Sequence, residues 1–178
     1  MICSYRYFEE TEVPKDELII SRTDLNGNIT YANEVFANIS GYKVEELLGK
    51  PHSIVRHPDM PKSIFKELWE TIEQGKMWKG YVKNLRKDGG YYWVYAEVSG
   101  VYKDDELIEY KSIRTPVSKE EKRLYQDRYD ALRQKEEKVC RVVADISVDN
   151  YEKLKKLAKE ESIEEREILN YILNDSLL

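Results

Sequence analysis

The sequence predicts an α+β fold, in which short helices lie on one side of a five-stranded antiparallel sheet. Three observations favour this fold class. Alternating apolar residues at 18–31 and 78–117 are typical of strands. The stretches DLNGN, KDGG and KDDE interrupt these runs with residues that tight hairpin turns require. Between the two β-rich parts, residues 32–74 carry apolar side chains at helical intervals.

The first part of the predicted domain is a hairpin followed by three helices. Two apolar runs on either side of an Asn-Gly turn predict the hairpin. Residues 32–39 then have the apolar spacing of a helix, which Gly41 ends. KVEELLGKP predicts a second, short helix. Residues 62–74 predict a third helix with an apolar stripe, and Gly75 ends it.

The second part of the domain, residues 78–117, predicts three long strands. KDGG and KDDE separate the three extended runs, and the first of these turns contains the Asp-Gly pair of a tight hairpin. Two strands, several helices and three further strands therefore form one domain, for which we expect the bounds 5–118.

The end of the chain predicts a linker and a small second module. Residues 119–138 have dense charge and a narrow apolar stripe, which favours a solvated linker helix, with a coiled-coil signalling helix as the alternative. Residues 139–178 predict a strand and two amphipathic helices. So short a module cannot bury its apolar faces alone, so we expect a homodimer.

Charge and cysteine content exclude several classes of protein. A net charge of −5 argues against a broad electrostatic surface for nucleic acid or an anionic membrane. Cys3 and Cys140 form neither a disulfide framework nor a zinc motif, which favours a reducing, cytoplasmic location. No apolar run approaches the roughly 20 residues of a membrane span, and the first residues do not resemble a signal peptide, so we expect no membrane insertion.

The stretch IVRHPDMPKSIFKELW gathers Arg56, His57 and Asp59 between two prolines. The chain has only two histidines, and the second, His52, lies close by. Such a cluster suits acid–base chemistry, ligation of a metal or haem, or the binding of an anionic cofactor. No nucleophile, P-loop or metal-ligand spacing accompanies it, so we do not expect an enzyme.

The order of elements is that of a PAS domain, and DLNGNITYANEVFANISGY resembles the usual PAS opening. GKPHSIVRHPDMPKSIFKELWETIEQGKMWKGYVKNLRKDGGYYWVYAEV more specifically resembles the PAS domain of bacterial aerotaxis receptors, which bind FAD and report cellular redox state. The resemblance covers about residues 5–118 and ends there. It implies an FAD-binding PAS sensor in this part of the chain.

The resemblance also implies which residues bind the cofactor: Asn33, Arg56, His57, Asp59, Phe65, Trp78 and Asn84. The aromatic side chains suit the flat flavin ring, and the two amides suit its polar rim. Arg56 and His57 would donate to the pyrophosphate, with Asp59 orienting one of them. On reduction, we expect the amide of Asn84 or Asn33 to reverse and the sheet to transmit the change.

Other cofactors remain as alternatives to FAD, namely FMN, haem or none. A haem pocket needs an axial histidine, usually from a helix, whereas both histidines here lie in a proline-bounded loop. The chain has no cysteine between Cys3 and Cys140, which argues against flavin–cysteinyl photochemistry.

Residues 139–178 resemble a ribbon-helix-helix module, a family of small dimeric DNA binders. The resemblance implies that Arg141, Val143 and Asp145 point toward DNA. Six basic and nine acidic side chains give this segment a net charge of −3, which disfavours DNA binding. We therefore expect a redox- or oxygen-sensing signal-transduction protein that acts on a protein partner. The alternatives are a PAS-regulated transcription regulator and a cofactor-free PAS scaffold.

Overall fold

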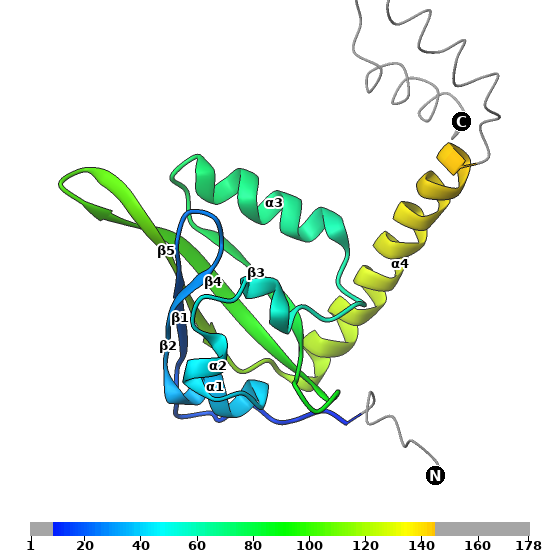
Figure 1. Cartoon of the computed structure of the whole chain (residues 1–178). Coiled ribbons are helices and arrows are strands. Elements are labelled where there is room, and N and C mark those ends of the chain that lie inside the picture. Colours follow the sequence, from blue (N-terminus) through cyan, green and yellow to red (C-terminus); the bar gives the residue numbers. More distant parts are fainter. Residues whose placement is uncertain (1–8, 145–178) are drawn as a thin grey trace, which may run out of the picture. The chain divides into compact units, whose positions relative to one another are not determined.

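The computed structural model describes residues 9–144, which form a five-stranded antiparallel sheet with helices (Figure 1). The strand order is β2-β1-β5-β4-β3. Five strands and helices on one face confirm the predicted α+β fold class. The strand order, which places the last strand in the middle of the sheet, was not predicted.

The first hairpin pairs β1 (Ile19–Thr23) with β2 (Ile29–Ala32). The carboxylate of Asp24 accepts hydrogen bonds from the backbone N–H groups of Asn26 and Asn28, at 3.0 and 2.8 Å. Gly27 supplies the positive φ of 82° that the turn requires. The predicted Asn-Gly hairpin is confirmed.

Helix α1 (Glu34–Ser40) is fixed at its start by Asn33. The side-chain oxygen of Asn33 accepts hydrogen bonds from the N–H groups of Phe36 and Ile20, both at 3.0 Å, and its amide donates to the carbonyl of Leu18 at 2.7 Å. One side chain thus caps the helix and joins it to β1. Gly41, with φ of 74°, ends the helix as predicted.

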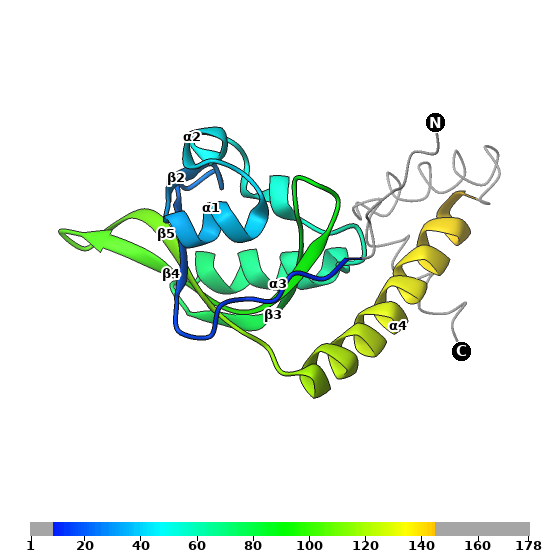
Figure 2. The same cartoon turned by 90° about the horizontal axis from the view of Figure 1, so that it is seen from below.

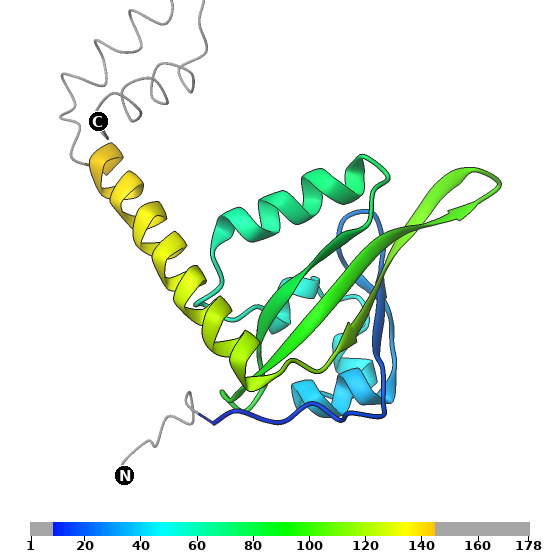
Figure 3. The same ribbon diagram turned by 180° about the vertical axis from the view of Figure 1, so that it is seen from behind.

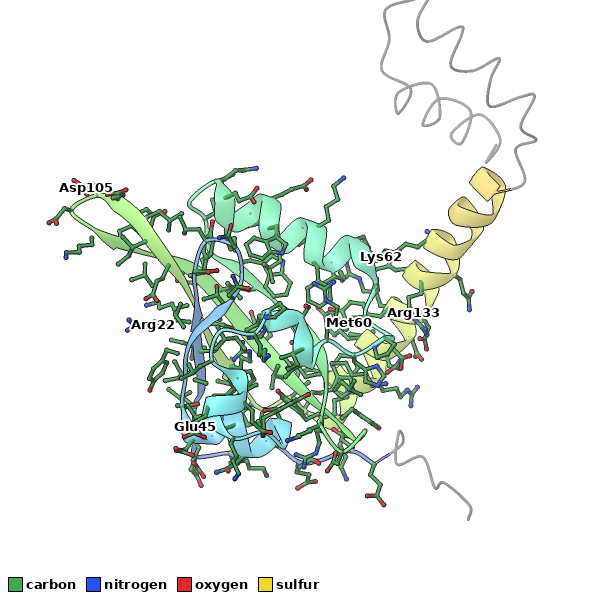
Figure 4. All side chains as sticks on the ribbon, viewed as in Figure 1. Arg22, Glu45, Met60, Lys62, Asp105 and Arg133 are labelled. Atoms are coloured by element: carbon green, nitrogen blue, oxygen red, sulfur yellow. The ribbon has the colours of Figure 1, made fainter. Side chains whose placement is uncertain are left out.

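Two short elements and one longer helix connect the hairpin to the rest of the sheet. They are α2 (Val44–Leu47), the 3₁₀ turn η1 (His52–Val55) and α3 (Lys62–Glu73). Pro61 precedes the first residue of α3 and Gly75 follows its end, so both predicted boundaries are close to the observed ones. Figure 4 labels Met60 and Lys62 on either side of this start.

Three long strands form the rest of the sheet: β3 (Trp78–Leu85), β4 (Tyr91–Lys103) and β5 (Glu106–Thr115). The β3–β4 and β4–β5 pairs are antiparallel, as the two turn sequences predicted. Asp104 and Asp105 form the turn of the second hairpin, both with positive φ, and Figure 4 labels Asp105 at its tip.

The two faces of the sheet have different coverings. Helices α1, α2 and α3 lie on one face, here called the inner face (Figures 1 and 3). The largest side chains that are fully buried include Tyr92, Phe36, Ile19, Leu47 and Ile72. Their burial removes apolar area from water and fixes the helices against the sheet.

Helix α4 (Lys119–Ala144) begins on the opposite, outer face (Figure 2). The ring of Tyr125 stacks on Tyr81 with 3.8 Å between centroids, and Tyr129 stacks on Trp93 at 6.1 Å. The Tyr129 hydroxyl donates to the carbonyl of Tyr81 at 2.6 Å. The start of the predicted linker helix is therefore packed on the sheet rather than solvated on all sides.

Helix α4 also extends further than predicted. The expected linker helix ended at residue 138, whereas residues 139–144 are helical in the structure and not part of a strand. A strand there needs a second strand to satisfy its backbone, whereas a helix satisfies it within the chain. Arg141 and Val143 lie within α4, and their role toward DNA stays a prediction. Asp145 and the remainder of the ribbon-helix-helix-like module lie outside the described residues.

No helix within residues 9–144 combines the length and the apolar character that a membrane span needs.

Asn33→Ala should lower the free energy of unfolding by about 1–3 kcal/mol, because it removes a helix cap and leaves the N–H of Ile20 without its acceptor. Urea denaturation followed by circular dichroism measures this change. Asn38→Ala is the matched control, since Asn38 is exposed in the same helix. Equal stability of the two variants would contradict the structural role of Asn33.

Candidate functional site

A cavity of about 290 Å³ lies between the inner face of the sheet, η1 and α3. This volume is near the lower end of the roughly 300–1,000 Å³ found for small-molecule sites. The sheet contributes alternate residues of β3, β4 and β5, because successive side chains of a strand point to opposite faces.

The walls of the cavity are largely apolar and aromatic. Phe65 and Trp69 of α3 line it together with Trp78 and Val82 of β3. A Cβ atom at Gly80 would lie 2.4 Å from the indole ring of Trp78, so the indole occupies the space that a side chain at position 80 would fill. The flat walls suit a planar ligand.

Four buried hydrogen-bond donors in this lining have no partner at hydrogen-bond geometry among residues 9–144. They are the indole N–H of Trp78, the amide Nδ2 of Asn84, the hydroxyl of Ser112 and Nη1 of Arg114. Buried polar atoms nearly always have a hydrogen-bond partner, and each orphaned one costs free energy. Four such donors in an apolar cavity indicate a ligand with hydrogen-bond acceptors on its edge.

Arg114, Ser21 and His52 form a polar cluster at one end of the cavity. Nη2 of Arg114 donates to the hydroxyl of Ser21 at 2.9 Å and lies 2.6 Å from Nε2 of His52. The His52 ring stacks on Phe36 with 5.6 Å between centroids. Burial and the adjacent Arg114 charge lower the pKa of His52 to about 3, so the imidazole is neutral.

Four of the seven residues predicted to bind a cofactor line the cavity, namely Arg56, Phe65, Trp78 and Asn84. The Arg56 guanidinium lies 3.7 Å from the centroid of the Phe65 ring, and a β-bridge joins Arg56 to Asn84. This bridge is how residues 28 positions apart in the sequence reach the same site.

The other three predicted residues, Asn33, His57 and Asp59, are not on the lining. Asn33 caps α1, as described above. Nδ1 of His57 accepts a hydrogen bond from the N–H of Asp59 at 3.1 Å, and its ring packs edge-on against Tyr91. The carboxylate of Asp59 pairs with Nζ of Lys83 at 2.7 Å. Nδ1 of His57 also lies 3.5 Å from Oδ2 of Asp59.

Lys83 connects this turn to helix α4. Its Nζ also donates to the side-chain oxygen of Gln126 at 3.2 Å and lies 4.5 Å from the Tyr91 ring centroid. Asn84, the next residue of β3, faces the cavity on the other side of the sheet. Two consecutive residues of one strand therefore reach the cavity and the helix.

Arg114, Ser112, Trp69 and His52 also line the cavity, and none of them was predicted to do so from the sequence. One signal was present, because Tyr110, Ser112 and Arg114 alternate along β5 with the residues that face outward. Polar residues at inward positions of a central strand indicate a site. The missing step was the strand order, which places β5 in the middle of the sheet.

The arrangement can bind and orient a planar heterocycle with acceptor atoms. Within residues 9–144, no group of three or more His, Cys, Asp or Glu side chains could hold a metal ion. The hydroxyl of Ser21 lies 3.2 Å from Nε2 of His52, but the charged group beside this histidine is the Arg114 guanidinium, whereas a nucleophile–histidine pair is usually oriented by a carboxylate.

Comparison with known proteins gives related sequences. Residues 29–114 match the model of the PAS fold family. The chain is 43% identical over 124 residues to the aerotaxis receptor of Escherichia coli (strain K12), which covers 70% of this chain and 24% of the receptor. It is 33% identical over 109 residues to the nitrogen fixation regulatory protein of Klebsiella pneumoniae, covering 61% and 22%. The biofilm dispersion protein BdlA of Pseudomonas aeruginosa is 34% identical over 79 residues, covering 44% and 19%.

The chain thus spans a quarter or less of the length of these relatives. Among solved structures, a PAS domain from Colwellia psychrerythraea has a TM-score of 0.52 and 27% identity, covering 57% of this chain and 87% of that domain. A light-oxygen-voltage domain studied with a flavin analogue has a TM-score of 0.55 and 20% identity, covering 64% and 86%, and shows the shared fold. The described chain therefore contains a PAS sensor domain, homologous over 70% of the chain to the aerotaxis receptor.

Proposed function

We propose that the chain is a cytoplasmic redox-sensing protein that binds FAD in the cavity of its PAS domain. Four buried, unpartnered donors around a flat apolar cavity carry this proposal. The isoalloxazine ring of a flavin is planar, with acceptor atoms along its pyrimidine side, and therefore matches both features. When bound, a flavin supplies reversible electron transfer that the protein side chains lack.

The lining residues have distinct roles in such a site. Trp78 and Phe65 form the apolar walls, while Asn84 and Ser112 offer polar groups to the rim. Arg56 is exposed where the lining meets solvent, which suits contact with the phosphates of FAD. A dinucleotide is favoured over FMN by the similarity to the aerotaxis receptor.

Haem suits this cavity less well than flavin. Nε2 of His52 is in contact with Arg114 and Ser21, so that nitrogen is engaged. His57 is not on the lining. A haem iron would have to displace one of these contacts to gain an axial ligand.

The redox state would be relayed through β3. Asn33 is held by three backbone hydrogen bonds, so Asn84, whose Nδ2 is unpartnered, is the amide that can reverse when the ring is protonated. The next residue, Lys83, contacts Asp59 and Gln126. A small shift of β3 would therefore change the packing of α4 on the outer face.

The output is a protein partner rather than DNA. Similarity to the aerotaxis receptor and to other signalling proteins supports this assignment. The acidic balance of residues 139–178 weakens any contact with phosphates. We propose that a homodimer presents α4 and the C-terminal segment to this partner.

The freshly purified protein should be yellow, show the two visible absorption bands of oxidised flavin and release FAD on heating. Asn84→Ala should weaken FAD binding about ten- to hundredfold, corresponding to roughly 1–3 kcal/mol for a lost buried hydrogen bond. Titration of the apoprotein with FAD by flavin fluorescence measures the affinity.

Asn26→Ala is the control for this titration, because Asn26 lies on the cavity rim in the turn between β1 and β2. Its loss should change the FAD affinity much less than Asn84→Ala. A colourless protein that takes up no added flavin would overturn the redox proposal and leave a cofactor-free PAS scaffold.

Lys83→Met should uncouple the flavin from α4. In the wild type, reduction should change hydrogen exchange in both β3 and the first half of α4, whereas the variant should keep the change in β3 alone. Lys79→Met is the matched control, since Lys79 is on the same strand and pairs with Glu97 in an exposed ion pair at 2.6 Å. Identical exchange in oxidised and reduced wild-type protein would contradict the relay.

A further inference from the structure

Arg114 is a buried cation for which no carboxylate partner exists among residues 9–144. Arg114 lies on β5 and is 4% exposed. No aspartate or glutamate among residues 9–144 forms an ion pair with it. No aspartate or glutamate lines the cavity. Burying an unpaired charge costs several kcal/mol, so a native protein normally compensates it.

The groups around Arg114 cannot supply the negative charge. Ser21 and the neutral His52 accept from Nη2, so the imidazole proton resides on Nδ1. The Phe36 ring lies 4.9 Å from the guanidinium carbon. Burial raises the pKa of the nearby Tyr92, which keeps its phenol protonated.

The other charged side chains that line the cavity are cations, while the carboxylate of Glu73 acts electrostatically on the lining residue Tyr110 from outside the lining. Arg56 and Lys111 line it, and Arg86 acts electrostatically on Tyr92. Burial lowers the pKa of Arg114 to about 10, which leaves the guanidinium charged at neutral pH. The whole lining is therefore positive, and its most buried positive charge is at Arg114.

The direction of the unpaired groups indicates where compensation would come from. Nη1 of Arg114 and the hydroxyl of Ser112 are both buried without partners, and they lie two residues apart on the same face of β5. Together they offer a charged and a neutral donor to one edge of a ligand. An edge that becomes anionic would gain most from this pair.

We propose that Arg114 is the counter-ion of a negative charge on the ligand, so that a flavin bound here is held in its anionic form when reduced. This inference rests on the proposed function. Dithionite supplies two electrons in the test, and solvent supplies one proton to N5. No proton is added at N1, because the guanidinium compensates the charge that a second proton would otherwise neutralise.

The test titrates the reduced, flavin-bound wild type and Arg114→Met from neutral to lower pH. The absorption spectrum reports the protonation state, because it differs between neutral and anionic reduced flavin. The wild type should remain anionic to a proton concentration at least tenfold higher than the variant. Arg114→Lys keeps the charge and should resemble the wild type more closely. Arg56→Met, which removes an exposed cation of the same lining, should have a smaller effect. Identical titrations of the wild type and Arg114→Met would overturn the proposal.

Urea unfolding of the ligand-free proteins supplies a second, flavin-independent measurement. Arg114→Met should be at least as stable as the wild type, because it removes an uncompensated charge while the Ser21–His52 contact at 3.2 Å remains. A less stable variant would show that Arg114 serves the fold and would overturn the proposal. If neither protein binds flavin, the redox function fails, yet this comparison still decides whether Arg114 is a buried charge that awaits an anion.

Discussion

The alternation of side chains along β3 is the constraint on which the site and its connection to α4 depend. Trp78, Val82 and Asn84 face the cavity, whereas Tyr81 and Lys83 face the outer side of the sheet. A shift of register by one residue would exchange these two sets. Pairing with β4 over the full length of β3 opposes that shift, so the strand lines the cavity with one face and contacts α4 with the other.

The proline-bounded turn at residues 56–59 divides its side chains between the same two regions. Arg56 joins the cavity through its bridge to Asn84, while His57 and Asp59 pack toward Tyr91 and Lys83. The turn thus links the cavity lining to the edge of the sheet. This division explains why charged side chains cluster so densely at residues 56–59. Arg56 contributes to the cavity, whereas His57 and Asp59 contact Tyr91 and Lys83.

Local patterns predicted the elements well, since hairpin turns, helix ends and strand alternation depend on neighbours in the sequence. Gly41 and the Asn-Gly turn are examples. The positions of residues that are distant in the sequence but adjacent in the fold could not be predicted. Arg114 reaches Ser21 because β5 pairs with β1, which no local signal encodes. Asn33 matches a binding residue of the family by type, yet its side chain forms three hydrogen bonds with backbone groups. The family resemblance implied seven cofactor-binding residues, and only the structure separates the four that line the cavity from the three that do not.

The close approach of Trp78 to Gly80 has a consequence for how such domains diverge. Because the indole occupies the volume of a side chain at position 80, the two positions cannot change independently. Homologues that retain the tryptophan at position 78 must also retain the glycine at position 80, although glycine weakens a strand. Homologues that lack the tryptophan can accommodate a β-branched residue at position 80. Covariation of these two positions would therefore record whether a lineage has kept this shape of cavity.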